Sequence, residues 1–461
     1  MLYLLSTGLL LAIAANAQDS IPLLQGTVSI SIKDGTFDCD FILSNIPAIK
    51  NYFIRINSGM NILNFRSLQP NDFLIYYNKS LNDTMSSGES IPYYFADNTG
   101  KGKFLPNKIE FKYAGKYPVV KDTIKDYSAE DWKGNIAFNG YSVRADGMQC
   151  AWFPVLYDID KDFAYYEVKY DIIVNCKDCN NLFINGTTPK TGNSAHFKSD
   201  VPVQPLLFCG NYKVVNSNGN YVLNPDINET QIERLGKNTN WYKNFYEEKL
   251  QIPYKKSITY IHTTPTSKGN AFSFITYPTI VNIGWGKYGL EGFANENEHT
   301  PNVGLAHELG HYYFGSYKVF NSELGDVMTE GFATYLSFKA VKARVNDSTY
   351  KNFIDSRLKG IKNFVAVPFA KIKSATDYHN RETYSYNYSA FIFLAIEKEI
   401  GEQKMWDWLH NILVTKTEYT NYSFLEQTLD NTLKDKNKLD LIKSKYFYAD
   451  QSVENIEKEL Q

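Results

Sequence analysis

The sequence predicts a protein of two parts, an antiparallel β domain followed by a mainly α-helical domain that contains a small sheet. Between residues 25 and 210, short runs of β-branched and aromatic residues alternate with Gly, Asn, Asp and Pro. After Tyr221 the segments lengthen and take helical spacing. A chain of 461 residues is also too long for one hydrophobic core. We therefore expect a β domain over residues 18–212 and a helical domain over residues 213–461.

The expected elements of the second part follow from local pattern. Four segments carry apolar residues at helical spacing: Gln231 to Leu250, Val303 to Phe314, Met328 to Val345 and Tyr388 to Ile400. A pair of strands is expected between the first two helices, at Ser257 to Ile261 and Ala271 to Ile283, because β-branched and aromatic residues dominate there. Pro278 indicates an edge strand or a break within the second run.

The first residues have the pattern of an export signal. Leu2 to Ala14 form a short apolar run, and Ala15-Asn16-Ala17 has the small-x-small pattern of a signal-peptidase site. The run is shorter than the roughly 20 apolar residues that a membrane span needs. We expect a signal peptide over residues 1–17, maturation at Gln18, and an exported protein, periplasmic or secreted, without a transmembrane anchor.

The charge of the chain limits its possible macromolecular partners, and its cysteine spacing limits the possible bonding of Cys176 and Cys179. Lys+Arg 48 against Asp+Glu 50, without a dense basic cluster, excludes nucleic acid as an expected partner. Cys176 and Cys179 have C-x-x-C spacing, but no second pair completes a zinc site, so a local disulfide or two free thiols is expected. The oligomeric state stays open.

A metal-site motif lies in the second expected helix. Residues 307–311 read H-E-L-G-H, so His307 and His311 lie four residues apart on one helical face and can reach one ion. Glu308 lies beside them. A catalytic zinc ion takes three protein ligands and keeps its fourth position for water. The motif therefore requires a third ligand, and Glu308 is the candidate base that activates the water.

Glu330 is the candidate third ligand. It follows His311 after 18 intervening residues, enough to end one helix, form a loop and start another. Phe332, Leu336 and Ala340 give the second helix an apolar face with which to dock. The sequence thus predicts a zinc site of His307, His311 and Glu330.

These motifs resemble a known family. Residues 307–315 (HELGHYYFG) and 330–335 (EGFATY) closely resemble the aminopeptidase N (membrane alanyl aminopeptidase) family of gluzincins, which has the same gap between the two motifs. Residues 386–401 resemble the helix that opens with the family's catalytic tyrosine, which places that tyrosine at Tyr386. The likeness extends from about Gly140 to Asp430.

The resemblance implies a fold, a cofactor and a substrate class. It implies a saddle-like β domain, a thermolysin-like catalytic domain, one zinc ion and peptide substrates. It also implies that Tyr386 stabilises the oxyanion of the tetrahedral intermediate. The large helical C-terminal domain that many members carry is expected to be absent.

One stretch departs from the family pattern. The family has a G-x-M-E-N type strand whose glutamate binds the free α-amino group of the substrate, and the corresponding stretch here is Phe274 to Pro278. Thr276 stands where the glutamate belongs, with Tyr277 beside it, so these two are the expected substrate-binding residues. A hydroxyl lacks the charge that makes pairing with an ammonium strong. Other carboxylates that could bind the amine are Glu291, Glu296 and Glu298.

Three functions are compatible with this pattern. The leading hypothesis is a zinc aminopeptidase that releases N-terminal residues from peptides. An endopeptidase, or a peptidase that acts on blocked peptides, is the alternative because of Thr276. A non-catalytic zinc- or peptide-binding module is the third, and the retention of Glu308 beside both histidines argues against it.

Overall fold

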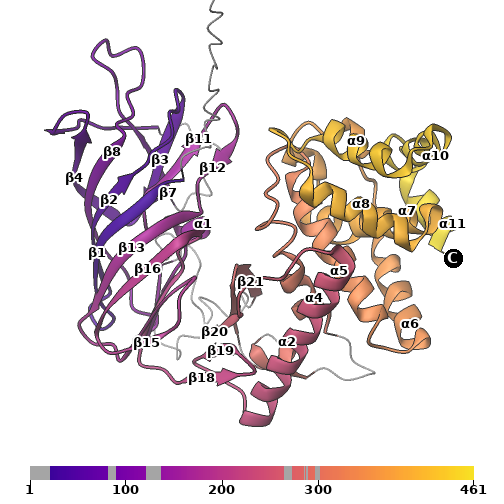
Figure 1. Ribbon diagram of the computed structural model, residues 1–461, viewed down its shortest axis with the longest axis horizontal. Helices are drawn as coiled ribbons and strands as arrows, with labels where there is room; N and C mark the ends of the chain where they lie inside the picture. The colour runs from indigo at the N-terminus through magenta and orange to yellow at the C-terminus, as the bar shows by residue number, and fades with distance from the viewer. Residues whose placement is uncertain are drawn as a thin grey trace, which may run out of the picture.

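The computed structural model of the protein describes residues 21–80, 90–120, 136–263, 272–284, 286, 289–295 and 302–460. The expected signal peptide, residues 1–17, lies outside the described residues. Within the described ranges, no helix combines the length and the apolar character that a bilayer span requires. Strands dominate the first part of the chain and helices the second, as Figure 1 shows. The expected fold class is confirmed.

The first part contains three sheets. The largest has seven strands in the order β16-β13-β1-β2-β8-β4-β5. These are β1 (Leu23–Ser31), β2 (Thr36–Ser44), β4 (Met60–Gln69), β5 (Phe73–Leu74), β8 (Lys108–Lys116), β13 (Val168–Cys176) and β16 (Ser194–Val203). In β8 the side chains of Ile109, Phe111 and Tyr113 are buried and alternate with more exposed neighbours, as the period of a strand requires.

Two five-stranded sheets complete the β domain. One has the order β12-β11-β3-β7-β6 and the other β15-β14-β17-β10-β9. The first comprises β3 (Tyr52–Asn57), β6 (Asn78–Lys79), β7 (Ser90–Tyr94), β11 (Val155–Asp158) and β12 (Phe163–Ala164). The second comprises β9 (Ala137–Phe138), β10 (Ser142–Ala145), β14 (Asn181–Ile184), β15 (Lys190–Thr191) and β17 (Leu207–Gly210). A short helix, α1 (Gly147–Cys150), follows β10.

One strand pair in the β domain departs from the antiparallel expectation. β1 and β13 run parallel, with Leu24 opposite Tyr170 and Val28 opposite Val174. Parallel neighbours need a long crossover connection, and here much of the β domain intervenes between the two strands. Local alternation predicts each strand but contains no information on which distant strand it pairs with.

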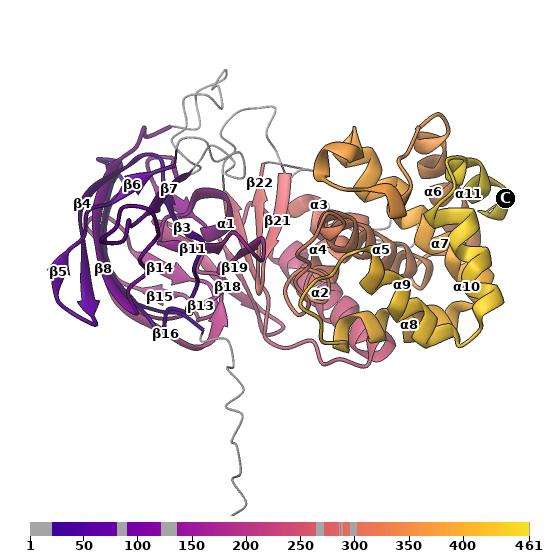
Figure 2. The same ribbon diagram turned by 90° about the horizontal axis from the view of Figure 1, so that it is seen from above.

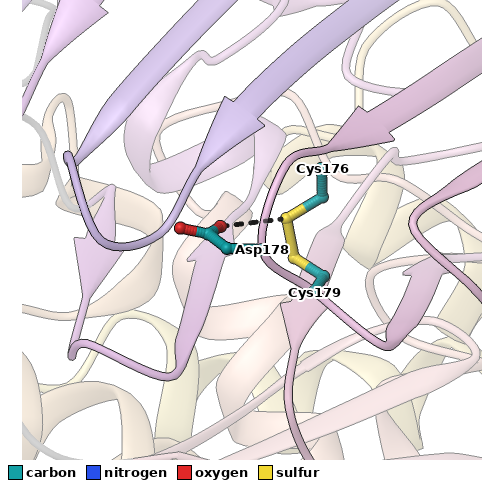
Figure 3. A group of neighbouring side chains, drawn as sticks. All are labelled: Cys176, Asp178 and Cys179. Carbon is teal, nitrogen blue, oxygen red and sulfur yellow. Dashed lines mark hydrogen bonds between the residues drawn. A yellow bond between two sulfur atoms is a disulfide. The ribbon is translucent and has the colours of Figure 1, made fainter.

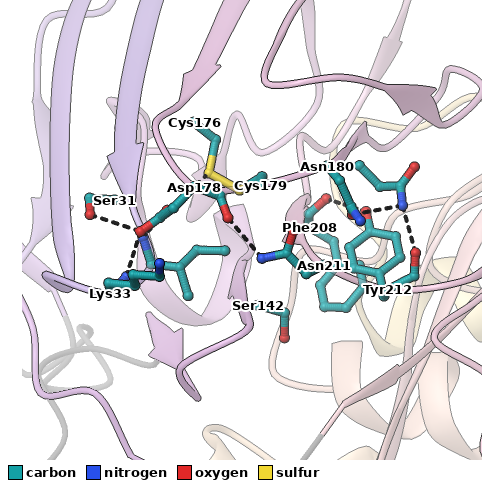
Figure 4. The surroundings of a disulfide bond; sticks show 12 residues. Ser31, Lys33, Ser142, Cys176, Asp178, Cys179, Asn180, Phe208, Asn211 and Tyr212 are labelled. Atoms are coloured by element: carbon teal, nitrogen blue, oxygen red, sulfur yellow. Dashed lines mark hydrogen bonds between the residues drawn. A yellow bond between two sulfur atoms is a disulfide. The ribbon is translucent and has the colours of Figure 1, made fainter.

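The C-x-x-C pair forms a disulfide between Cys176 and Cys179, with the Cα atoms 5.5 Å apart, so the disulfide alternative holds (Figure 3). Asp178 lies between the two cysteines. Its carboxylate accepts hydrogen bonds from the backbone N–H groups of Ile32 and Lys33 at 2.8 and 2.9 Å (Figure 4). The disulfide loop thereby fastens the end of β13 to the end of β1.

The second part begins with a mixed sheet of five strands, in the order β18-β19-β20-β22-β21. These are β18 (Val214–Ser217), β19 (Asn220–Leu223), β20 (Thr259–Thr263), β21 (Phe272–Thr276) and β22 (Thr279–Ile283). In both views the sheet lies between the β domain and the helices (Figures 1 and 2). Pro278 breaks the expected second strand into β21 and β22, and β21 forms the edge.

Helices form the remainder of the second part. The α-helices are α2 (Glu229–Leu250), α3 (Leu290–Ala294), α4 (Val303–Gly310), α5 (Phe332–Lys342), α6 (Asp347–Leu358), α7 (Ser389–Ile400), α8 (Glu402–Val414), α9 (Tyr422–Leu433), α10 (Lys436–Ile442) and α11 (Ser452–Leu460). Short 3-10 turns, η4 (Lys359–Ile361), η5 (Phe369–Lys371) and η6 (Ala375–Tyr378), lie between α6 and the next segment. Three π-helical segments, η3 (Val327–Gly331), η7 (Glu382–Tyr388) and η8 (Lys443–Phe447), adjoin α5, α7 and α10.

The packing of α4 against α5 positions the site. Phe332, Leu336 and Ala340, the apolar face expected of the second helix, are fully buried. A Cβ on Gly310 would lie 3.3 Å from the Cα of Ala333, so glycine allows the two helices to approach closely. Burial of this face holds the residues just before α5 against the end of α4.

Candidate metal centre

Helix α4 is held in place from both ends. Asn302 caps it, because its side chain accepts a hydrogen bond from the N–H of Leu305 at 3.0 Å. The hydroxyl groups of Tyr246 and Tyr254 donate to the carbonyls of Ala306 and Leu309 at 2.8 and 3.1 Å. Part of the high tyrosine content thus fixes the helix that carries the H-E-x-x-H motif.

His307, His311 and Glu330 converge on one point. The two Nε2 atoms lie 3.0 Å apart, and the Oε2 atom of Glu330 lies 3.3 Å from that of His307 and 3.2 Å from that of His311. Ligand atoms bound tetrahedrally to zinc at its usual bond lengths are roughly 3.3 Å apart. The three atoms therefore have the separations of ligands to a common zinc ion.

Each imidazole contacts another protein group through Nδ1, and its Nε2 atom faces the point where the three side chains converge. His311 Nδ1 lies 3.1 Å from the carbonyl oxygen of Phe314, which can only accept, so Nδ1 carries a proton and Nε2 is the nitrogen that can bind a metal. His307 Nδ1 lies 3.2 Å from the hydroxyl of Thr334. Within the described part of the chain, the buried Oε2 of Glu330 makes no hydrogen bond. Two imidazole nitrogens and a carboxylate oxygen suit a divalent cation.

The charges of the site differ from those of exposed residues. Burial raises the pKa of Glu308, although the adjacent His307 and His311 oppose the rise. Burial also acts to raise the pKa of Glu330, but attraction to His311 and His307 outweighs it and holds that pKa well below its usual range. Glu330 is therefore the anionic ligand candidate, and Glu308 is a carboxylate whose affinity for a proton is increased.

Tyr386 differs from its two neighbouring tyrosines. Tyr384 and Tyr388 are fully buried, and their hydroxyls bond to the carbonyl of Val367 and to Ser452 Oγ at 2.5 and 2.7 Å. The ring of Tyr386 lies 5.5 Å from that of His307 and lines the cavity beside the metal-site residues. Burial raises its pKa, so the phenol keeps its proton at neutral pH. Of the three, Tyr386 is the hydroxyl placed to act as a donor.

The site opens into a cavity of about 1280 Å³ between the β domain and the helices. Thr276 lines it from the edge strand β21 and Tyr277 from the turn that follows, while Met148 and Gln149 line it from the β domain. A space of this size accommodates a peptide of several residues. The structure thus brings all seven residues predicted for the site to one cavity.

The glutamate expected of the family at position 276 is replaced, as the sequence indicates. Thr276 is almost fully buried, and its carbonyl accepts a hydrogen bond from Asn185 of the β domain at 2.9 Å. Among the alternative carboxylates, Glu291 accepts a hydrogen bond from Asn295 at 3.1 Å. Glu296 and Glu298 lie outside the described residues.

Sequence reasoning missed several residues that support the site. Thr334 had a usable signal, because it lies four residues after Glu330 and so shares its helical face. No sequence pattern marks Arg381 or Asp326 as part of the site. They are 55 positions apart in the chain, yet their side chains form an ion pair beside Glu330.

The chain was compared with known proteins at the level of sequence and of fold. No protein-family model and no curated protein sequence matches it. Among solved structures it is similar to yeast LTA4 hydrolase in complex with bestatin, with a TM-score of 0.65 and 11% identity over 94% of this chain and 68% of that one.

Two structures from Deinococcus radiodurans match over most of their length. The M1 zinc metallopeptidase gives a TM-score of 0.57 and 12% identity over 94% of both chains. A mutant of that enzyme bound to a Tyr-Ser-Ala substrate gives a TM-score of 0.58 and 12% identity over 92% of this chain and 93% of that one. Likeness at such low identity establishes the fold, and the chain therefore has the fold of the M1 zinc metallopeptidases.

Proposed function

We propose that this protein is a zinc-dependent peptidase that releases N-terminal residues from peptides, with one zinc ion held by His307, His311 and Glu330. The convergence of three ligand atoms at 3.0 to 3.3 Å carries the proposal. The shared fold supports it, since a solved protein with this fold was captured with the substrate Tyr-Ser-Ala.

The residues have distinct roles in the proposed reaction. A bound zinc ion supplies Lewis acidity, which polarises the scissile carbonyl and lowers the pKa of a water molecule. Glu308 accepts the proton of the attacking water and then delivers it to the leaving amine. The phenol of Tyr386 donates a hydrogen bond to the oxyanion of the tetrahedral intermediate.

The edge strand β21 provides a place for the substrate backbone. Among the strands that the structure describes, only β22 pairs with β21, so the other side of β21 is the side on which an extended peptide would add a strand. Thr276 ends this strand at the cavity, and Tyr277 follows it in the turn to β22.

A second candidate, cleavage of internal or N-blocked peptide bonds, is favoured by one observation. Thr276 brings no negative charge to the position where the resembled family binds the α-ammonium. A substrate bound there gains no strong ion pair with that residue. Both candidates use the same metal, base and phenol, and they differ only in how the end of the substrate is recognised.

The test combines metal analysis with two substrate classes. Zinc content is measured, and hydrolysis of aminoacyl-arylamides is compared with that of matched N-acetylated peptides. Glu308→Gln serves as the control for contaminating peptidases. We expect one zinc ion per chain, turnover only of free-amine substrates, and an inactive control. Equal turnover of acetylated peptides would establish the second candidate, and zinc binding without any turnover would indicate a binding module.

A further inference from the structure

We propose that Arg381, anchored by Asp326, is a positioning residue that fixes the Glu330 carboxylate relative to the phenol of Tyr386. The inference rests on the metal site proposed above and adds residues that the reaction uses indirectly. It would explain how two segments far apart in the chain present a metal ligand and a hydrogen-bond donor to the same substrate carbonyl.

Each of the two functional groups lies on a π-helical turn. Glu330 belongs to η3 (Val327–Gly331), and Tyr386 belongs to η7 (Glu382–Tyr388). A π-helical turn inserts an extra residue, which rotates side chains to positions that a regular helix does not reach, and such turns are frequent at functional sites. The two turns pack against each other. Their relative position therefore sets the distance between ligand and donor.

Close packing fixes the spacing of the two turns. A Cβ on Gly331 would collide with the side chain of Ser389, the first residue of α7. Ser389 in turn donates a hydrogen bond to the carbonyl of Ser385 within η7. Glycine at position 331 thus brings η3 within contact distance of the segment that carries Tyr386.

A polar bridge fixes their relative orientation. Asp326 immediately precedes η3, and Arg381 immediately precedes η7. The Nε and Nη2 atoms of Arg381 donate to Oδ1 of Asp326 at 3.1 and 2.5 Å. Ser385 of η7 donates to the other oxygen, Oδ2 of Asp326. The Asp326 carboxylate therefore bonds both to the residue just before η7 and to the middle of η7.

The same guanidinium contacts both functional groups. Its Nη2 atom lies 3.3 Å from Oε1 of Glu330, while Oε2 of Glu330 faces the two imidazoles. The guanidinium thus holds Oε1 while Oε2 is turned toward the two imidazoles, and this arrangement defines the rotation of the carboxylate. The Arg381 Cζ atom also lies 5.5 Å from the ring centroid of Tyr386. The planar guanidinium of Arg381 has several N–H donors and can contact Asp326, Glu330 and Tyr386 at the same time, whereas a lysine ammonium is a single point of charge.

The solvent exposure of the bridge separates a positioning role from a stabilising one. The side chain of Arg381 is 57% exposed, and ion pairs at such sites contribute little to stability. Loss of the bridge should therefore alter the chemistry of the site with little change in the thermal midpoint. Another exposed ion pair, Lys371 to Asp450 at 2.7 Å, lies outside the metal site and provides a matched control.

The experiment compares Arg381→Ala, Arg381→Lys, Asp326→Asn and Lys371→Ala with the wild type. Zinc affinity is measured by competition with a chelator, kcat and KM with one peptide substrate, and the midpoint of thermal unfolding. We expect Arg381→Ala and Asp326→Asn to weaken zinc binding and lower kcat, each by about tenfold or more, with little change in KM. Arg381→Lys should recover only part of both losses, and Lys371→Ala should change neither.

Three results would overturn the proposal. If the wild type binds zinc and Arg381→Ala has unchanged zinc affinity and kcat, the positioning role of Arg381 is refuted while the proposed metal site stands. A rise in KM confined to peptides with a free C-terminal carboxylate, absent for their C-terminal amides, would make Arg381 a substrate contact instead. A wild type that binds no zinc would refute the proposed metal site and the bridge together.

Discussion

At the scale of single residues, the site depends on hydrogen bonds that decide which atoms are free to react. Tyr384 and Tyr388 have their hydroxyls engaged by Val367 and Ser452, whereas the ring of Tyr386 borders the cavity. The local sequence contains several tyrosines within five residues, and spacing alone does not distinguish them. Only the direction of each side chain distinguishes Tyr386, the proposed donor, from the other two.

Replacement of Tyr386 by Phe tests this selection. Removal of one donor to an oxyanion lowers kcat by about a hundredfold or more, so we expect that loss with little change in KM. Tyr384→Phe should keep its turnover because its hydroxyl bonds to a backbone carbonyl away from the metal site. Steady-state kinetics of the two variants measure both effects, and full activity of Tyr386→Phe would refute the assignment of Tyr386 as the oxyanion donor.

Thr334 makes a second prediction at the same scale. Its hydroxyl lies 3.2 Å from Nδ1 of His307, and outer partners of metal-binding histidines orient the ring. We expect Thr334→Val to weaken zinc binding by about tenfold, measured by chelator competition. Ser337→Ala is the control, since that hydroxyl bonds to the carbonyl of Thr334 on the same helix. Equal affinity of Thr334→Val and wild type would rule out an orienting role.

At the scale of elements, a partly buried ion cluster ties α7 to the C-terminal helices. Glu399 of α7 accepts a hydrogen bond from Lys438 at 2.8 Å and another from Lys445. The Glu399 side chain is 10% exposed. Burial acts to raise the pKa of Glu399, but the hydrogen bonds from Lys438 and Lys445 outweigh it and lower the pKa to about 2. The cluster therefore holds the helix that continues from the Tyr386 segment.

The depressed pKa of Glu399 predicts an acid-dependent loss of stability. Because the folded pKa lies below the unfolded one, the stabilisation is present above about pH 4.5 and is lost as the pH falls toward 2. We expect the difference in unfolding free energy between wild type and Glu399→Gln to shrink by about 2 kcal/mol between pH 5 and pH 3. Urea unfolding at both pH values measures it. A difference independent of pH would contradict the cluster's role.

At the scale of the whole molecule, one asparagine links the β domain to the strand that borders the cavity. Asn185 is fully buried, and its side-chain N–H groups contact the carbonyls of Gln204, Thr276 and Tyr277 at 2.9 to 3.0 Å. Its oxygen accepts from Thr279 at 2.7 Å. The β domain thus forms one wall of the site and also sets the position of the edge strand.

Asn185→Ala should affect both stability and substrate binding. The change leaves buried carbonyls without a donor, which costs about 1 to 3 kcal/mol of unfolding free energy, and it loosens β21, so KM should rise. Asn57→Ala is the matched control, because Asn57 is equally buried but bonds to Cys150 and Tyr117 within the β domain. Denaturant unfolding measures the loss of unfolding free energy in the two variants, and steady-state kinetics measure their KM. A KM unchanged in Asn185→Ala, or raised equally in Asn57→Ala, would refute a specific link.

Short-range patterns predict a large share of this architecture. Helices α2, α4, α5 and α7 lie where apolar spacing places them, because the burial of one helical face leaves a period in the sequence. The strands of the first part are likewise readable from alternation. Pairing between distant strands, such as β1 with β13, is not readable, since local pattern does not encode a partner.

The sequence by itself determined the chemistry: two histidines at helical spacing with a glutamate between them, and a second motif at a fixed distance. The two histidines lie on one face of α4 because they are four residues apart, whereas Glu330 reaches them through the packing of α4 against α5. The tertiary structure alone decided what surrounds them. Arg381 reaches Asp326, and Asn185 reaches Thr276, only because packing of the core brings together segments whose contacts no local periodicity records.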